Sequence, residues 1–221
     1  MDNQSTSYSA AELTKRQSII DACIEMNRLG INQGTSGNIS VRHEDYILIT
    51  PTSTPYDQLT VDSIVRLEMD GTTKGTLQAS SEWQFHRDIM AARTDVNAIV
   101  HTHPIYSTII AIMGLPIPAI HYMVAVVGGD DIRCAPYAIF GSQELSENAV
   151  EALQGRTACL LEHHGIIAVG GTLSKALWLS VEVETLARQY HGVLQLGTPR
   201  LLPKEEIARV LEKMGSYGHK D

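Results

Sequence analysis

An apolar run that ends in two histidines restricts the fold of this chain more than any other feature. Residues 98–100 are Ala, Ile and Val, and His101, Thr102, His103 and Pro104 follow them. The run predicts a buried strand, in which His101 and His103 point to one face and Thr102 to the other. Two imidazoles on one face can hold the same ion, but a catalytic zinc site needs a third protein ligand. Without a third ligand, two half-buried histidines bonded to their neighbours are an equal interpretation.

A second apolar run with histidines at its end offers that ligand. Residues 158–161 predict a strand, and the segment Glu162–Gly165 after it contains two adjacent histidines. If the two strands are neighbours in one sheet, an imidazole of this segment joins the first pair. The pattern therefore predicts a metal site built from two strand ends.

Three polar turns are candidate anion sites. They are Gln33–Asn38, Thr50–Pro55 and the pair Ser80-Ser81, which precedes a helix that starts near Trp83. Glycine allows backbone N–H groups to approach an oxyanion, and the free N–H groups at a helix start attract negative charge. An ordinary connection explains each turn about as well, so none of them alone establishes a phosphate site.

Glu82 follows the serine pair and has two interpretations. A carboxylate in the first turn of a helix is favoured by the helix dipole, which is a structural role. A carboxylate near a metal can instead act as a general base. The local sequence favours the structural role.

The length and charge of the chain limit its class. Its 221 residues, 43% of them hydrophobic, can bury one large core, and no linker or repeat divides them. We expect a flexible N-terminal tail over residues 1–9 and a single domain over residues 10–221. The formal net charge of −8 argues against nucleic acid as a partner.

Localisation follows from the cysteines and from the apolar runs. The three cysteines are far apart and odd in number, which is typical of reduced thiols. No apolar run approaches the length that spans a bilayer, and the first ten residues lack the apolar core of a signal peptide. We expect a cytoplasmic protein with no membrane partner.

The order of helices and strands predicts the fold class. Predicted strands lie at 39–42, 46–50, 64–69, 98–103, 117–122, 132–137 and 158–161, and predicted helices at 10–29, 83–90, 105–112, 142–155, 172–186 and 203–215. Helices fall before, between and after the strands without regular alternation. The chain is expected to be an α/β protein with a central mixed or antiparallel sheet covered by helices on both sides.

The motifs in this order and spacing resemble the class II aldolase/adducin family over nearly the whole chain after about residue 10. The residues that carry the resemblance are Asn32–Asn38, Ile49–Thr52, Ser80–Trp83, His101–His103, Ala119–Met123, Cys134–Tyr137 and His163–Gly165. The resemblance is strongest to members that act on L-fuculose 1-phosphate. It implies a zinc aldolase that reversibly cleaves a ketose 1-phosphate to dihydroxyacetone phosphate and a short aldehyde such as L-lactaldehyde.

The resemblance also assigns the catalytic residues. The family's zinc ligands fall on His101, His103 and His164, with one ion per subunit and Co²⁺ or Mn²⁺ as alternatives to Zn²⁺. His163 is then a supporting or packing residue. The acid/base carboxylate falls on Glu82, where it can remove a carbon-bound proton while the ion stabilises the resulting charge.

The three polar turns together match the family's phosphate site. The matching residues are Gly37, Asn38, Thr52, Ser80 and Ser81, and Ser53 lies at a sixth position of the same site. The family has glycine where this chain has Ser53, so a side chain stands at a position that glycine would leave free. Ser53 either adds a donor or marks a pocket that has shifted toward another phosphoester.

Three aromatic residues complete the resemblance. Tyr122 matches the tyrosine that handles the proton on the aldehyde oxygen, Tyr217 one that reaches a neighbouring subunit, and Phe140 an aromatic wall of the aldehyde pocket. Packing is the alternative for both tyrosines, and it is stronger for Tyr217 because it lies in the tail. The family also implies a fourfold cyclic homotetramer with active sites at subunit interfaces.

Other activities of the same family stay open. Relatives that cleave 5-deoxyribulose or 5-methylthioribulose 1-phosphate share the catalytic residues, and a sugar-phosphate 4-epimerase or a decarboxylase uses the same metal. Adducin-like interaction domains lack the metal ligands. This chain keeps the three histidines and Glu82, which argues against a purely structural role.

Overall fold

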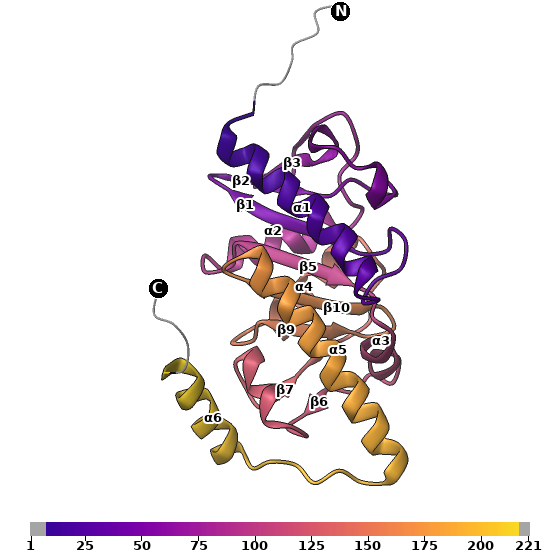
Figure 1. The fold of residues 1–221 in the computed structure, drawn as a ribbon, viewed down its shortest axis with the longest axis vertical. Coiled ribbons are helices and arrows are strands. Elements are labelled where there is room, and N and C mark those ends of the chain that lie inside the picture. The colour runs from indigo at the N-terminus through magenta and orange to yellow at the C-terminus, as the bar shows by residue number, and fades with distance from the viewer. Residues whose placement is uncertain (1–7, 217–221) are drawn as a thin grey trace, which may run out of the picture.

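An eight-stranded sheet forms the centre of the molecule in a computed structural model that describes residues 8–216 (Figure 1). The strand order is β4-β3-β2-β1-β5-β10-β9-β8. The strands are β1 Asn38–His43, β2 Tyr46–Ile49, β3 Val65–Glu68, β4 Thr73–Lys74, β5 Ala98–Thr102, β8 Cys134–Ala135, β9 Ala158–Leu161 and β10 Gly165–Gly170. All neighbours are antiparallel except β8 and β9, which are parallel, so the predicted mixed sheet is confirmed.

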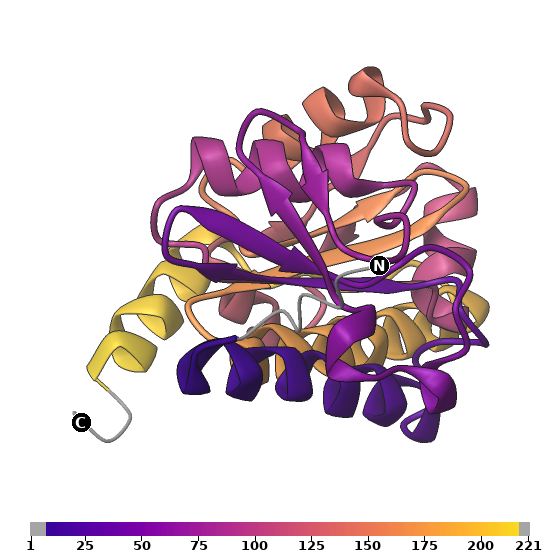
Figure 2. The ribbon, with the colours of Figure 1, turned by 90° about the horizontal axis from the view of Figure 1, so that it is seen from above.

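Helices cover both faces of this sheet. They are α1 Ala10–Arg28, α2 Trp83–Ala92, α3 Ile105–Ile112, α4 Gln143–Ala152, α5 Leu173–Leu196 and α6 Lys204–Ser216. Short 3₁₀ helices lie at Tyr56–Gln58, Val61–Ser63 and Tyr122–Val127 (η3), and β6 Ile117–Pro118 pairs with β7 Asp131–Ile132. Helices α2 and α4 pack on one face, and α1, α3 and α5 on the other (Figure 2).

The first helix begins and ends as its sequence predicts. The Ser9 Oγ accepts the Glu12 N–H at 3.1 Å, and Gly30 follows the helix with φ of 70°. Such caps satisfy backbone groups that a helix end leaves unpaired. Between these ends, the apolar side chains of α1 share one core with Ile39 of β1 and Val100 of β5.

The strand β10 was not predicted, and it changes the sheet. Strands β5 and β9, expected to be neighbours, are separated by β10, in which Ile167 pairs with His101 on one side and Cys159 on the other. The segment from Gly165 to Gly170 is apolar on both faces and bounded by glycine. A short apolar run of this kind carries no period that distinguishes a strand from other buried segments.

The other difference lies in the region predicted as a strand or extended link over residues 117–122. Only Ile117 and Pro118 are strand, and the chain turns at His121 into η3. The His121 Nδ1 accepts the Met123 N–H at 3.1 Å and so caps this short helix. A side-chain cap of this type offers the backbone an alternative to strand pairing.

Candidate metal centre and substrate cavity

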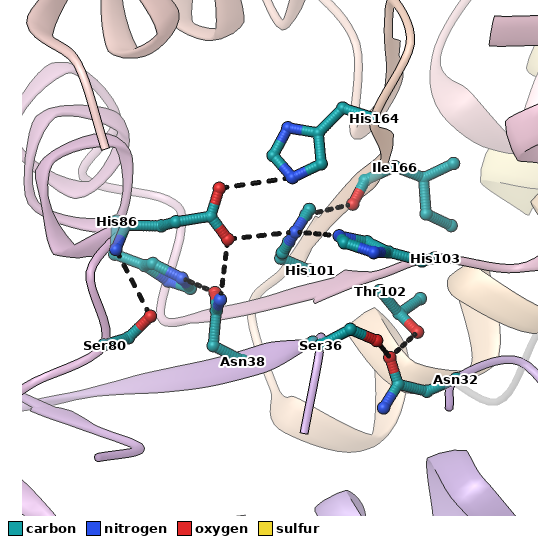
Figure 3. A network of polar contacts seen from close by, with 12 residues as sticks. Asn32, Ser36, Asn38, Ser80, His86, His101, Thr102, His103, His164 and Ile166 are labelled. Carbon is teal, nitrogen blue, oxygen red and sulfur yellow. Dashed lines mark hydrogen bonds and ion pairs between the residues drawn. The ribbon is translucent and has the colours of Figure 1, made fainter. Parts of the chain in front are cut away.

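Three histidines from two strand ends meet at one point. His101 and His103 come from the end of β5, and His164 comes from the turn between β9 and β10. One ring nitrogen of each lies within 4.8 Å of the others, and Nε2 of His101 lies 2.9 Å from Nε2 of His103. Figure 3 shows the three imidazoles turned toward one another. The intervening β10 leaves the predicted triad intact because His164 stands at its beginning.

The hydrogen bond on the far side of His101 prepares this ring for a cation. His101 Nδ1 lies 2.8 Å from the Ile166 carbonyl oxygen, which can only accept. Nδ1 therefore carries a hydrogen, and Nε2 is the ring nitrogen that faces the centre and is available to a metal. Nε2 of His103 faces the same point, 2.9 Å from Nε2 of His101, where one cation could bind both nitrogens.

Burial keeps the other two imidazoles neutral. Loss of water around the rings, together with the neighbouring His101, lowers the pKa of His103 to about 3 and that of His164 to about 4. Neutral imidazole is the form that binds metal. The donor set of three neutral nitrogens fits Zn²⁺ with an open coordination position.

Two glycines allow the backbone to approach this strand. A Cβ on Gly37 would lie 2.6 Å from the His101 carbonyl oxygen, and a Cβ on Gly165 would lie 2.6 Å from that of Thr102. The turn between β9 and β10 passes through His163, whose φ of 54° is left-handed. Strained residues of this kind are held where the surroundings fix them, and this one directly precedes His164.

The carboxylate of Glu82 faces the histidines. Its Oε2 lies 3.2 Å from His101 Nε2, and its Oε1 lies 3.3 Å from His164 Nε2. Glu82 directly precedes α2, but its side chain makes no capping bond to the helix and instead faces the histidines. Burial raises the pKa of Glu82, but His101, His164 and Asn38 more than offset this effect and hold it well below its ordinary value.

A further polar chain lies behind Glu82. Asn38 Nδ2 donates to Glu82 Oε2 at 3.0 Å, and Asn38 Oδ1 lies 2.5 Å from Nε2 of His86. His86 Nδ1 lies 2.7 Å from Oγ of Ser40 on β1. Sequence reasoning missed His86 and Ser40. The available indication was the spacing of four between Glu82 and His86, which puts both on one side of a helix start.

The second and third polar turns lie side by side. The Thr52 N–H donates to the Gln78 carbonyl at 3.0 Å, and the Ser80 N–H donates to that of Thr50 at 3.0 Å. Ser80 is buried, and its Oγ accepts the Glu82 N–H at 3.3 Å. The hydroxyl groups of both turns are thus gathered beside the start of α2.

Ser53 occupies the position where glycine was expected and adopts a glycine-like conformation. Its φ is 51°, in the left-handed region that side chains disfavour. It is exposed, and its Oγ lies 3.4 Å from Oγ1 of Thr52. The backbone of this turn therefore keeps the shape that a glycine would give it.

A cavity of about 380 Å³ opens over the histidines. It is lined by Ser36, Ser81, Glu82, His103, Tyr137, Ala138, Phe140, His163 and His164. A second cavity of about 510 Å³ shares Ser36, His103 and His164 with it and adds the α3 residues Ile105, Ile109 and Ile112. Phe140 is 64% exposed at the edge of the first cavity.

Tyr122 lies elsewhere in this chain. It is 50% exposed on η3 and lines a cavity of about 790 Å³ with the α6 residues Glu206, Arg209, Val210, Lys213 and Met214. Neither cavity at the histidines includes it. Tyr217 falls outside the described residues.

The sequence matches a known family over most of its length. The family described as "Class II Aldolase and Adducin N-terminal domain" matches residues 17–191. This chain belongs to the class II aldolase and adducin family. Its fold and its triad of histidines agree with that membership.

Several relatives are similar over nearly the whole chain. L-fuculose phosphate aldolase of Escherichia coli strain K12 is 52% identical over 90% of this chain and 94% of the relative. The 5-methylthioribulose-1-phosphate/5-deoxyribulose-1-phosphate aldolase of Rhodospirillum rubrum is 50% identical over 94% of both. A solved L-fuculose 1-phosphate aldolase superposes with a TM-score of 0.90 at 35% identity, covering 96% of this chain and 99% of its own.

The family match, together with aldolases that are 50% and 52% identical to this chain, makes the chain an enzyme, a class II aldolase that acts as an aldehyde-lyase. Within residues 8–216 no helix combines the length and apolarity that crossing a membrane requires.

All three cysteines are free. Burial raises the pKa of Cys134 to about 11 and that of Cys159 to about 12, so neither is a reactive thiolate near neutral pH.

Proposed function

We propose that the protein is a zinc-dependent aldolase that reversibly cleaves a ketose 1-phosphate of the L-fuculose 1-phosphate type. The products are dihydroxyacetone phosphate and a short aldehyde such as L-lactaldehyde. The observation that carries the proposal is the approach of the Glu82 carboxylate to within 3.2 Å of His101 and 3.3 Å of His164, beside a cavity. A proton acceptor and a metal-binding triad at one point are what carbon-acid chemistry requires.

Three histidines would hold the ion, namely His101, His103 and His164. When bound, Zn²⁺ or a substitute such as Co²⁺ or Mn²⁺ lowers the cost of negative charge on the substrate oxygens next to the reacting carbon. The Ile166 carbonyl fixes the ring of His101 through Nδ1, so its Nε2 stays aimed at the centre.

Glu82 performs the proton transfer at carbon. In the direction of synthesis its carboxylate takes the proton from C3 of dihydroxyacetone phosphate, and in cleavage it returns that proton to the same carbon. Its lowered pKa, which results from His101, His164 and Asn38 outweighing the effect of burial, keeps it ionised before the substrate binds. Removal of the substrate's C–H proton by a positioned carboxylate is worth about 10²–10⁴ in rate.

The polar turns bind the phosphate group. The proposed donors are Gly37, Asn38, Thr52, Ser53, Ser80 and Ser81. The amide nitrogen of Asn38 carries two hydrogens, one of which goes to Glu82, and the second is left for a phosphate oxygen. Ser81 supports this placement because it is exposed and lines the cavity that contains Glu82.

The aldehyde end involves aromatic residues and a neighbouring subunit. In this proposal Phe140 forms a wall of the aldehyde pocket, and Tyr122 transfers the proton on the aldehyde oxygen. Tyr217 reaches the active site of a neighbouring subunit in a cyclic homotetramer. The exposed Phe140 at the cavity edge and the distance of the Tyr122 pocket from the triad in one chain both support an interface site. Sedimentation velocity of the purified protein measures the assembly directly.

A second substrate class has its own support. The Rhodospirillum rubrum relative named for 5-methylthioribulose and 5-deoxyribulose 1-phosphate is 50% identical to this chain. The second cavity is lined by Ile105, Ile109 and Ile112, which suit an apolar substrate tail.

Three free cysteines fit a reducing compartment, and we place the enzyme in the cytoplasm without nucleic-acid or membrane partners.

A panel of ketose phosphates tests the proposal. L-fuculose 1-phosphate, 5-deoxyribulose 1-phosphate and 5-methylthioribulose 1-phosphate are each incubated with the zinc-loaded enzyme, and dihydroxyacetone phosphate is assayed. The largest kcat/KM identifies the substrate class. If the products are an epimerised ketose 5-phosphate or CO₂, without dihydroxyacetone phosphate, the protein is instead the epimerase or the decarboxylase of the same family.

Metal analysis of gently purified protein tests the non-enzymatic alternative. Less than roughly stoichiometric divalent metal would favour an adducin-like role.

A further inference from the structure

The polar chain behind Glu82 contains two residues that the proposed reaction does not use. Ser40 on β1 and His86 on α2 are both fully buried, and the Ser40 hydroxyl group lies 2.7 Å from Nδ1 of His86. The other ring nitrogen of His86 faces Asn38 (Figure 3). The chain ends on the Glu82 carboxylate. Buried polar groups are retained only where they are hydrogen-bonded, so each link has a defined direction.

The direction of each bond follows from its two ends. The ionised Glu82 carboxylate can only accept, so the Asn38 amide presents nitrogen to it and oxygen to His86. That oxygen can only accept, so Nε2 of His86 carries the hydrogen. Burial lowers the pKa of His86 to about 3, and the ring is neutral. Its Nδ1 therefore accepts from the hydroxyl group of Ser40.

We propose that His86, held in one tautomer by Ser40, is a positioning residue that fixes the Asn38 amide and thereby the carboxylate of Glu82. The proposal rests on the catalytic role of Glu82 proposed above. A flipped Asn38 amide would put its oxygen 3.0 Å from the carboxylate, where two negative atoms repel each other. The Nε2 hydrogen of His86 prevents that flip.

The geometry explains why a fixed carboxylate is needed at this point. Glu82 precedes the first residue of α2, and its Oε1 has no hydrogen-bond donor within the described residues. Within residues 8–216, Asn38 donates a hydrogen bond to Oε2, and the other polar side chains close to the carboxylate are the candidate metal ligands His101 and His164. A misplacement of about 1 Å of a reacting group can cost on the order of 10²-fold in rate.

Nitrogen NMR of the imidazole tests the tautomer without any assay of activity. Protein labelled with ¹⁵N-histidine is loaded with zinc at neutral pH, and the His86 resonances are assigned by their loss in His86→Gln. We expect Nε2 to be the protonated nitrogen and Nδ1 to be unprotonated. A hydrogen on Nδ1 would refute the proposed direction of the chain.

Kinetics of His86→Leu test the positioning role. This variant should keep its zinc and its fold, while kcat and the exchange of the C3 proton of dihydroxyacetone phosphate fall by about 10- to 100-fold. The KM for dihydroxyacetone phosphate should rise by a smaller factor than kcat falls, since His86 contacts Asn38 but no other proposed phosphate donor through a side-chain hydrogen bond. His86→Gln should recover much of the exchange because its amide N–H can donate to Asn38. Exchange at the wild-type rate in His86→Leu would overturn the proposal.

Matched variants control for the loss of a buried polar group. His43→Leu removes a histidine that is 5% exposed and has a side-chain nitrogen without a partner, and it should leave exchange unchanged. If His86→Leu does not fold, Ser40→Ala tests the positioning role. It removes the hydroxyl group that donates to Nδ1 of His86, so the tautomer is no longer fixed, and the side chains nearest the metal site keep their volume. Ser180→Ala, which removes an equally buried hydroxyl from α5, is its control.

A double-mutant cycle shows whether His86 acts through Asn38. Asn38→Ala should slow exchange, and adding His86→Leu to it should slow exchange no further. Losses that multiply would refute action through Asn38. If the wild-type protein catalyses neither exchange nor cleavage, the proposed function fails. A wild-type enzyme that is active beside an equally active His86→Leu variant refutes only the positioning role.

Discussion

Two parts of the site differ in how the chain holds them. The buried cluster of Asn38, Glu82, His86 and His101 is at most 5% exposed, and its members bond to one another. The exposed rim of Ser81, Tyr137 and Phe140 lines the same cavity, but no side-chain polar bond between these three holds them in place.

The difference separates chemistry from recognition. Packing and hydrogen bonds set the geometry of the buried cluster before any substrate arrives, which is the preorganisation that proton transfer requires. The exposed rim gains its partners from the substrate or from a neighbouring subunit. Changes in the buried cluster should therefore alter metal content and kcat, whereas changes in the exposed rim should alter KM.

The largest effect is expected from His103→Ala, beside the buried cluster. Two imidazoles hold zinc far less well than three, so metal and activity should be lost together. Metal analysis by mass spectrometry after gel filtration, with the exchange assay in parallel, measures both. Wild-type metal occupancy in this variant would remove His103 from the ligand set.

Glu82→Gln should separate the base from the metal. The amide keeps the size of the side chain and removes the basic oxygen, so kcat should fall by about 10²–10⁴. The protein should stay folded and metal-bound, and exchange of the C3 proton of dihydroxyacetone phosphate should fail. Exchange at a near-normal rate would contradict the assignment even if overall turnover fell.

Acid should destabilise the metal-free protein through the buried histidines. The pKa values of His86, His103 and His164 are lowered to about 3, 3 and 4, so the folded state stays neutral while the unfolded chain takes up protons below about 6.5. Their contribution to stability is complete above that pH and is lost as pH falls. Each proton taken up on unfolding contributes a slope of about 1.4 kcal/mol per pH unit.

Urea unfolding of the metal-stripped protein between pH 7 and pH 5 measures this slope. His86→Gln should reduce it by up to one proton, because the titrating group is removed. A free energy of unfolding that does not change over this range would show that the histidines are not buried in the neutral form.

Ser81→Ala tests the exposed rim. The loss of one donor to a charged phosphate oxygen should raise KM by roughly tenfold, at the low end of the 1.5–3 kcal/mol for such bonds because Ser81 is exposed. Zinc content and kcat should stay close to those of the wild type. An unchanged KM would place the phosphate group elsewhere.

The smallest effect is expected at Ser53. Its left-handed φ of 51° costs about 1–2 kcal/mol for a residue with a side chain, partly offset by the greater entropy of unfolded glycine. Ser53→Gly should therefore raise the free energy of unfolding by about 0.5 kcal/mol. Glu44→Gly, at φ of 53° in the turn between β1 and β2, is the matched control and should leave KM unchanged. A destabilised Ser53→Gly would show that the hydroxyl group contributes to the turn.

Much of the site could be predicted because it depends on local periods. The alternation of a strand sets His101 and His103 on one face, and Thr102 does point to the other face, where its Oγ1 donates to the Ile31 carbonyl. The helix at residues 105–112 and the strand at 158–161 have the predicted bounds. These features involve residues that are close in sequence.

The tertiary structure decided the features that join distant residues. Asn38 and Glu82 are 44 positions apart, and His86 is 48 positions from Asn38, so no local pattern relates them. The insertion of β10 between β5 and β9 and the placement of Tyr122 away from the triad also depend on pairing across the whole sheet. Periodicity placed His101 and His103 on one face of a strand, because it is a property of a few neighbouring residues, while the roles of Glu82 and His164 were predictions from the resemblance. The fold alone decided which of them touch, because burial brings together groups that no short segment contains.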